Sequence, residues 1–133
     1  MRAVTRRLEG AVLAIIGVAL APGAGLADES SFKKDVLPVI NSQCVMCHLP
    51  GAESGELSLH PDPLASLVGI ASRQSSLKLV EPGAPDSSYM YLKLINAQES
   101  AGGSGLQMPP THALEDAQLE AIRRWIEQGA KAD

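Results

Sequence analysis

Hydrophobic side chains recur at helical spacing in three stretches of this chain. The first covers residues 30–44, where Pro38 interrupts the pattern and is expected to kink or divide the helix. The second covers residues 86–97, and the third and clearest covers residues 115–130. A short additional helix is predicted over residues 63–69, because an Asp-Pro pair precedes it and a glycine ends it. No strand pair and no internal repeat is evident, so the pattern predicts an all-α domain of three to four helices.

Polar residues at the helix starts and a glycine at the last helix end act as boundary signals. Ser30 or Ser31 can cap the first helix, and Asp86 or Ser87 can cap the helix that starts there. Gly129 stands where the last helix is expected to stop. Segments rich in glycine, proline and small polar residues predict irregular structure at residues 49–63, 70–85 and 99–114.

The first 27 residues are predicted to be a secretory signal peptide rather than part of the domain. Three arginines stand near the start, and an apolar run of 11 residues follows over residues 11–21. Small residues at Gly25 and Ala27 fit cleavage before Asp28. Because a bilayer span takes about 20 residues, this run is short for a membrane helix, and an uncleaved anchor is the alternative interpretation. Residues 28–133 are predicted to form one domain.

The predicted mature chain is acidic and poor in aromatic residues. Without the four charges of the N-terminal segment it holds 8 basic and 14 acidic residues, a net charge of −6. It offers no basic stripe to neutralise phosphates, so a nucleic-acid partner is not expected. A chain of this size buries only about 65% of its unfolded surface, and a large apolar cofactor would help to complete the core. The aromatic residues of the mature chain are Phe32, Tyr89, Tyr91 and Trp125.

Both cysteines of the chain lie within four positions and are followed directly by a histidine, in the order Cys44-x-x-Cys47-His48. This spacing is the attachment signature of c-type haem. Each thiol adds across one vinyl group of the porphyrin, so the two sulfurs must reach adjacent edges of one flat ring. The histidine after the second sulfur then lies beneath the iron and supplies the proximal ligand.

Three other interpretations begin with the same two sulfurs. A redox dithiol of the thioredoxin kind is expected within a βαβ pattern, which does not surround this motif. A zinc site takes four ligands, and His60 and His112 are the further histidines that could join it. A plain disulfide closing this short loop is the third alternative. The adjacent histidine and the predicted export signal favour haem.

Four segments of the chain resemble the compact exported mono-haem cytochrome c domains of the planctomycete type. They read "CVMCH", "LVEPGAPDSSYMYLKL", "GGSGLQMPP" and "AIRRWIEQGA", and the resemblance runs over residues 32–130. It implies a small all-α cytochrome c-like fold over residues 28–133, with the first and last helices crossing near one covalently bound haem. Phe32 and Trp125 could then pack against the ring, although a core position is the expected role of Trp125. The segment "ALEDAQ" departs from the family, whose members usually carry a serine cap there.

The distal ligand of the iron decides between electron transfer and catalysis. Met108 is the expected ligand, because Pro109 keeps it out of helical geometry and the preceding glycines allow the chain to cross the ring. It lies 60 residues after the proximal histidine, which leaves enough chain to wrap a haem. Met46 lies within the thioether loop and Met90 on a predicted helix. His112 and His60 are the remaining candidates.

Ligation by histidine and methionine raises the reduction potential of haem iron and leaves no position open for substrate. The sequence therefore predicts a periplasmic or otherwise exported electron carrier with one haem c and its iron, and no enzymatic activity. Redox proteins are its expected donor and acceptor, and the mature chain is expected to be a monomer or a subunit of a redox complex, without a membrane span. The alternative is a haem enzyme or sensor, peroxidase-like or gas-binding, with an open or labile sixth position.

Overall fold

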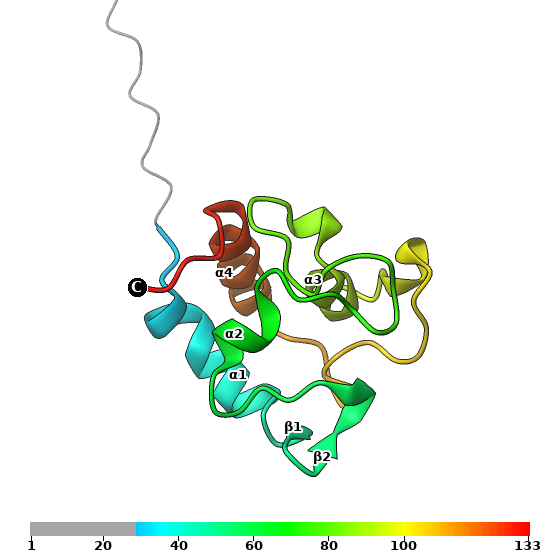
Figure 1. The fold of residues 1–133 in the computed structure, drawn as a ribbon. Coiled ribbons are helices and arrows are strands. Elements are labelled where there is room, and N and C mark those ends of the chain that lie inside the picture. The colour runs from blue at the N-terminus through cyan, green and yellow to red at the C-terminus, as the bar shows by residue number, and fades with distance from the viewer. Residues whose placement is uncertain (1–28) are drawn as a thin grey trace, which may run out of the picture.

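The computed structural model describes residues 29–133, and the predicted signal peptide and its cleavage point lie outside this range. The described chain is dominated by helices, as the hydrophobic pattern predicts (Figure 1). Its elements in chain order are a π-helical turn (Phe32–Val36), α1 (Leu37–Gln43), β1 (His48–Leu49), β2 (Ala52–Glu53), a 3₁₀ turn (Ser54–Glu56), α2 (Pro63–Leu67), a 3₁₀ turn (Pro85–Ser87), α3 (Tyr89–Leu94), a 3₁₀ turn (Gln98–Ala101) and α4 (Asp116–Glu127).

The first helix is divided as its proline predicts. Ser31 is the cap, and its hydroxyl accepts a hydrogen bond from the Lys34 amide at 3.1 Å. The helix begins as a wider π-helical turn and changes to α-helical hydrogen bonding at Leu37, directly before Pro38. Pro38 has no amide hydrogen to donate to the preceding turn, which accounts for the change of hydrogen-bond pattern at this point.

The caps of α2 and α4 follow ordinary rules. The Asp62 carboxylate accepts a hydrogen bond from the Ala65 amide at 3.1 Å, and Gly69, with φ of 74°, follows the end of α2. Before α4, which has no serine at its start, the Gln118 side chain accepts a hydrogen bond from the Glu115 amide at 3.0 Å. This is the return bond of a capping box, so the helix start is stabilised without a serine.

The predicted cap of α3 is wrong. Asp86 and Ser87 lie in a 3₁₀ turn that begins at Pro85, and α3 starts one or two residues later than expected. Ser88 occupies the cap position, but its hydroxyl does not bond to the helix. It accepts from the Glu81 amide and donates to the Ala84 carbonyl, both at 2.9 Å. The proline turn therefore uses the polar residues that would otherwise cap the helix.

A minimal hairpin lies where the sequence predicts only a loop. β1 and β2 pair antiparallel, with His48 opposite Glu53 and Leu49 opposite Ala52. Gly51 holds the turn between them with φ of 87°. Strands of two residues are too short to show the alternation by which a strand is recognised in sequence.

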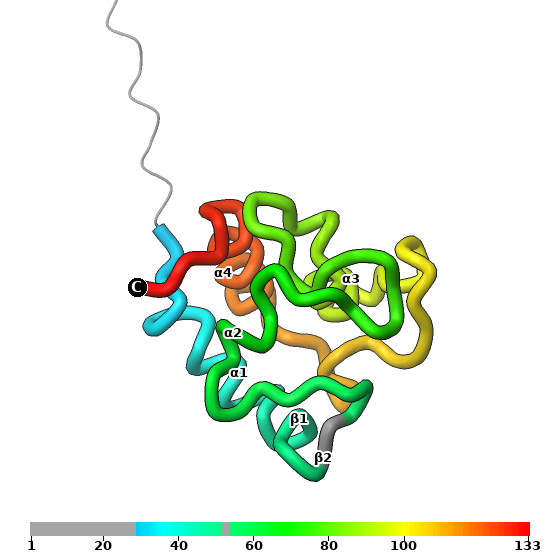
Figure 2. The backbone as a smooth tube through the Cα atoms, viewed as in Figure 1, coloured from blue at the N-terminus to red at the C-terminus, as the bar shows by residue number. Residues whose placement is uncertain are grey.

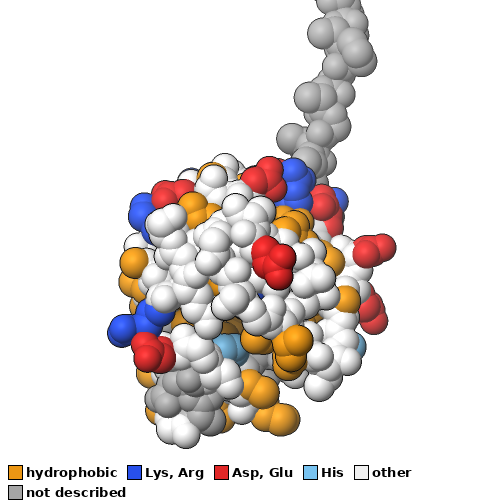
Figure 3. Space-filling view, turned by 90° about the vertical axis from the view of Figure 1, so that its right-hand side faces the viewer, with side chains coloured by type: hydrophobic (Ala, Val, Ile, Leu, Met, Phe, Trp, Pro, Cys, Tyr) orange, Lys and Arg blue, Asp and Glu red, His pale blue; other side chains and the backbone are white. Residues whose placement is uncertain are grey.

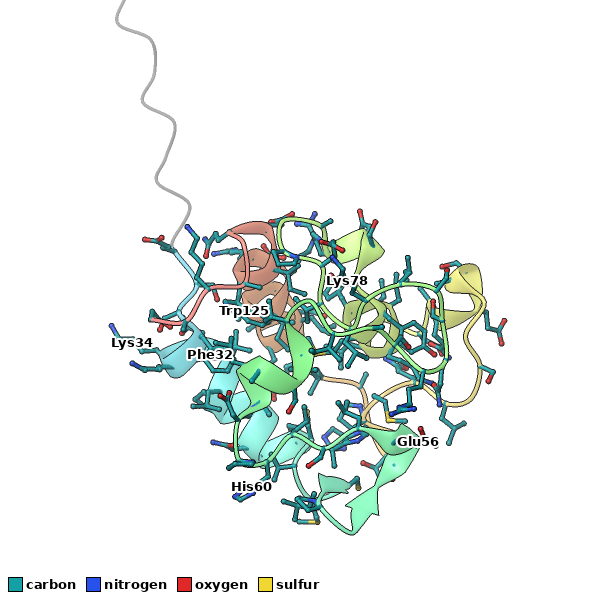
Figure 4. All side chains as sticks on the ribbon, in the orientation of Figure 1. Phe32, Lys34, Glu56, His60, Lys78 and Trp125 are labelled. Atoms are coloured by element: carbon teal, nitrogen blue, oxygen red, sulfur yellow. The ribbon has the colours of Figure 1, made fainter. Side chains whose placement is uncertain are left out.

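The core joins the two ends of the described chain. The π-helical turn packs against α4, and Phe32 faces Trp125 with ring centroids 5.3 Å apart (Figure 4). The indole of Trp125 is 1% exposed and donates to the Lys131 carbonyl at 3.0 Å. At the surface the Ser30 amide donates to the Gln128 side chain at 3.0 Å, and Ser31 bonds to the Asp133 carboxylate. Within residues 29–133 no helix is both long and apolar enough to cross a membrane.

Replacement of Trp125 by alanine should lower the free energy of unfolding by about 3–5 kcal/mol, because it opens a cavity beside Phe32 and breaks the indole hydrogen bond. Denaturant unfolding of the purified protein measures this loss. Lys34→Ala is the control, since Lys34 points away from the core (Figure 4) and surface substitutions change stability by about 0.5 kcal/mol or less. Equal effects of the two substitutions would show that the aromatic pair does not hold the chain ends together.

Candidate functional site

A cavity of about 380 Å³ lies between α1, α2, α3 and the segment that follows the hairpin. Cys44, His48 and Met108 all line it, so the fold brings the sequence-predicted sulfur and imidazole donors to one place across 60 residues of chain. Its walls are predominantly aliphatic, and its volume falls within the range of about 300–1,000 Å³ typical of cofactor pockets. Figure 3 shows a face of the molecule on which hydrophobic side chains lie around a histidine ring.

The ring of His48 is held in one orientation by the chain that follows it. Its Nδ1 lies 3.1 Å from the carbonyl oxygen of Leu57. Because a carbonyl only accepts, Nδ1 carries the proton and Nε2 keeps its lone pair. The main-chain oxygen of His48 also accepts from the Leu59 amide at 2.7 Å. Such a bond to the far nitrogen is the usual way in which proteins orient a metal-binding imidazole.

The two cysteines are free and lie in different environments. Cys44 caps α1 and is partly buried in the cavity wall. Burial, reinforced by the nearby Cys47, raises the pKa of the Cys44 thiol to about 11, so this thiol is protonated at neutral pH. Cys47 is exposed and does not line the cavity. Its amide bonds to the Cys44 carbonyl at 3.2 Å, which keeps both sulfurs within one turn of the chain.

Met108 is the last of these donors in the sequence. It lies in an irregular segment that is bonded to α3. Figure 2 shows this segment in yellow and orange as it leaves the α3 side of the molecule and returns to α4. The Met108 amide donates to the Lys93 carbonyl at 3.0 Å. The Gln107 side chain donates to the Leu94 carbonyl at 2.7 Å. Met108 therefore lines the cavity from a backbone position that is fixed by hydrogen bonds to α3.

Met90 also lines the cavity, from α3. The sequence predicts a core position for this residue, and it does pack against the hydrophobic core. The structure therefore places two methionine side chains at the cavity wall, and both are candidates for the distal sulfur. Met46, by contrast, is 82% exposed.

The two remaining histidines do not line the cavity. His60 is exposed and lies at the edge of the molecule (Figure 4). Both ring nitrogens of His112 have partners, since Nδ1 lies 2.9 Å from the Thr111 hydroxyl and Nε2 lies 3.0 Å from the Gln43 side-chain oxygen. Among residues 29–133 no three His, Cys, Asp or Glu side chains gather as a metal site, so the four-ligand zinc arrangement is not assembled.

Phe32 and Trp125 do not line the cavity either. Trp125 has the core role expected of it, packed on Phe32 between the two ends of the chain. Aliphatic side chains such as Ile40, Leu67 and Leu94 line the cavity instead, together with residues of the irregular segments 54–59 and 70–79. The Phe32–Trp125 pair and the cavity nevertheless share one hydrophobic core, because Val36, Ile40 and Ile122 belong to the same cluster and line the cavity.

The imidazole of His48 and the thioether of Met108 are donors of the kind that bind haem iron. Imidazole and thioether are ligands for haem iron, and neighbouring thiols can attach a porphyrin covalently. Comparison with protein-family models, curated proteins and solved structures gives no significant match. The cavity, the orientation of His48 and the position of Met108 therefore carry the functional argument.

The sequence analysis did not identify the polar residues that support the part of the cavity wall formed by Met108. Lys93 lies in α3, lines the cavity and is only 9% exposed. It stands four positions after Tyr89 and three after Met90, two residues that line the same cavity. Helical spacing could therefore have placed this lysine on the cavity side of α3. Its bonds to main-chain oxygens could not be read from the sequence.

Gly103 lets the segment before Met108 pass beside a buried ring. A methyl group at this position would overlap the ring and hydroxyl of Tyr89. Tyr89 is 3% exposed and donates to the Gln74 side chain at 3.0 Å, so it has little room to move. The absence of a side chain at residue 103 is therefore a condition for this path of the chain.

Gly103→Ala should lower the free energy of unfolding by about 1–3 kcal/mol, the usual cost of overpacking. Ser104→Ala is the matched control, because it changes the next residue and leaves the main-chain carbonyl in place. Its expected effect is about 0.5 kcal/mol or less. Thermal or denaturant unfolding of both variants measures the difference, and a neutral Gly103→Ala would mean that the chain does not pass this close to Tyr89.

Proposed function

We propose that the protein is an exported electron-transfer protein with one covalent c-type haem. Cys44 and Cys47 form the two thioether bonds, His48 is the proximal ligand and Met108 is the distal ligand. The observation that carries this proposal is the single cavity lined by Cys44, His48 and Met108, with the Nδ1 of His48 held by the Leu57 carbonyl. The fold around the haem is that of a small cytochrome c, and the predicted signal peptide directs the chain to the periplasm or another exported location.

Bound haem would supply an iron able to exchange one electron between Fe(II) and Fe(III). His48 and Met108 are the residues that would hold this iron. His48 keeps its Nε2 free for coordination because its Nδ1 donates to Leu57. The thioether of Met108 is a soft ligand, which favours the reduced iron and raises the reduction potential. With both positions taken, electron transfer to redox partners is favoured over substrate chemistry.

The chain also keeps water from much of the site. Leu59, Leu67 and Val36 all line the cavity and are buried, Leu67 and Val36 completely. Such a low-dielectric wall disfavours the more charged oxidised state and acts in the same direction as the thioether. At the rim, Arg73 and Glu56 form an ion pair at 3.0 Å with both side chains largely exposed.

Protein matured in a host with haem-attachment machinery should carry one haem per chain after denaturation. Mass spectrometry of the denatured protein measures this directly. The double variant Cys44→Ala, Cys47→Ala should retain no covalent haem, and each single variant should retain haem through one thioether. A parent protein of unmodified mass, with its thiols free or joined in a disulfide, would contradict the proposal.

Met108→Ala should remove the weak sulfur-to-iron charge-transfer band of the oxidised protein, lower the reduction potential and let the reduced protein bind CO readily. Haem should stay attached through both cysteines. Met90→Ala is the matched control, because it removes an equal side chain from the same cavity and should leave the band in place.

Each other outcome points to a different assignment. If Met90→Ala or His112→Ala opens the iron and Met108→Ala does not, the distal ligand is wrongly assigned. If the parent protein binds CO as fast as Met108→Ala, the sixth position is open and a peroxidase-like or gas-binding function replaces electron transfer.

A further inference from the structure

The side chain of Lys93 joins α3 to the segment that carries Met108. Its Nζ donates to the Ser104 carbonyl at 2.7 Å and to the Leu106 carbonyl at 2.8 Å. The two carbonyls flank Gly105, whose φ of 80° turns the chain there. One buried amino group therefore spans a tight bend just before the predicted ligand.

The main chain and the neighbours of Lys93 extend the same attachment. The Lys93 carbonyl accepts from the Met108 amide at 3.0 Å. Gln98 donates to the Gly105 carbonyl at 2.8 Å, and Gln107 donates to the Leu94 carbonyl. Each residue from 104 to 108 thus has a hydrogen bond to α3 or to the 3₁₀ turn after it, and Lys93 supplies three of these bonds.

Lys93 has no role in a surface ion pair that would explain its burial. Among the described residues no carboxylate forms an ion pair with it. Burial lowers the pKa of its amino group, yet the amine and the ammonium can both donate to a carbonyl. A buried lysine is costly without compensating bonds, and here the compensation comes entirely from the main chain of the Met108 segment.

We infer that Lys93 is a positioning residue for the distal ligand, holding residues 104–108 against α3 so that the Met108 thioether stays at the cavity. This inference rests on the proposed function for the role of Met108 as ligand. The attachment itself rests only on the bonds between Lys93 and the segment.

The test compares Lys93→Met with Lys93→Gln in the haem-loaded protein. Methionine keeps the volume and removes both bonds, whereas glutamine keeps one amide donor. Because Ser104 and Leu106 are exposed, water can replace the lost donor and the variants should fold. Lys93→Met should speed CO binding to the reduced protein roughly tenfold, weaken the charge-transfer band, and speed hydrogen exchange over residues 102–109 roughly tenfold. Lys93→Gln should lie between this variant and the parent.

Lys78→Met is the control for loss of positive charge. Lys78 bonds to Glu81 at the surface and does not line the cavity. It should leave CO binding and hydrogen exchange as in the parent, whatever it does to the reduction potential. If Lys93→Met does not accumulate with haem, Lys93→Gln carries the comparison with the control.

The experiment distinguishes failure of the inference about Lys93 from failure of the proposed Met108 ligation. If the parent shows the charge-transfer band and Lys93→Met and Lys93→Gln match it in band, CO binding and exchange, Lys93 is not a positioning residue. If the parent lacks the band and binds CO at once, Met108 ligation fails, while faster exchange over residues 102–109 in Lys93→Met would still support the attachment to α3.

Discussion

The hydrogen bond between the His48 Nδ1 and the Leu57 carbonyl is the contact on which the candidate site depends. Without it the imidazole could rotate or carry its proton on the other nitrogen, and no defined lone pair would belong to the cavity wall. The short hairpin makes this bond possible. The turn at Gly51 reverses the chain so that residues 57–59 return to His48, where Leu59 adds a main-chain bond. A local fold of about a dozen residues thus builds the proximal wall.

The distal wall is built differently, because its parts are distant in sequence from the cysteines. Helix α3 determines the position of this wall. It contributes Met90 directly, and it holds the Met108 segment through hydrogen bonds from and to Lys93 and its neighbours. His48, the proposed proximal ligand, is therefore placed by a tight turn, while Met108, the proposed distal ligand, is placed by packing against one short helix. Any change that shifts α3 would move both methionine sulfurs together.

The sequence allowed some of these features to be predicted and concealed others for physical reasons. Helical periodicity located α4, and the Asp62–Pro63 pair located the start of α2, since both depend on local interactions. The start of α3 was misplaced because Pro85 began a 3₁₀ turn that local patterns do not resolve. The hairpin was too short to produce alternation. The motif around Cys44 predicts haem attachment from its spacing alone, whereas the burial of Cys44 and the exposure of Cys47 depend on packing by residues far along the chain.

The aromatic pair and the cavity occupy different places in one continuous hydrophobic core. Phe32 and Trp125 join the two ends of the described chain, and neither lines the cavity. The cavity wall, in contrast, relies on aliphatic side chains and on hydrogen bonds between side chains and main chain. Exchanges between aliphatic side chains of equal volume usually cost less than about 1.5 kcal/mol. The donors at the cavity can therefore be tuned by nearby substitutions while the ends of the chain remain packed, and Lys93 is placed where such tuning would act most directly on Met108.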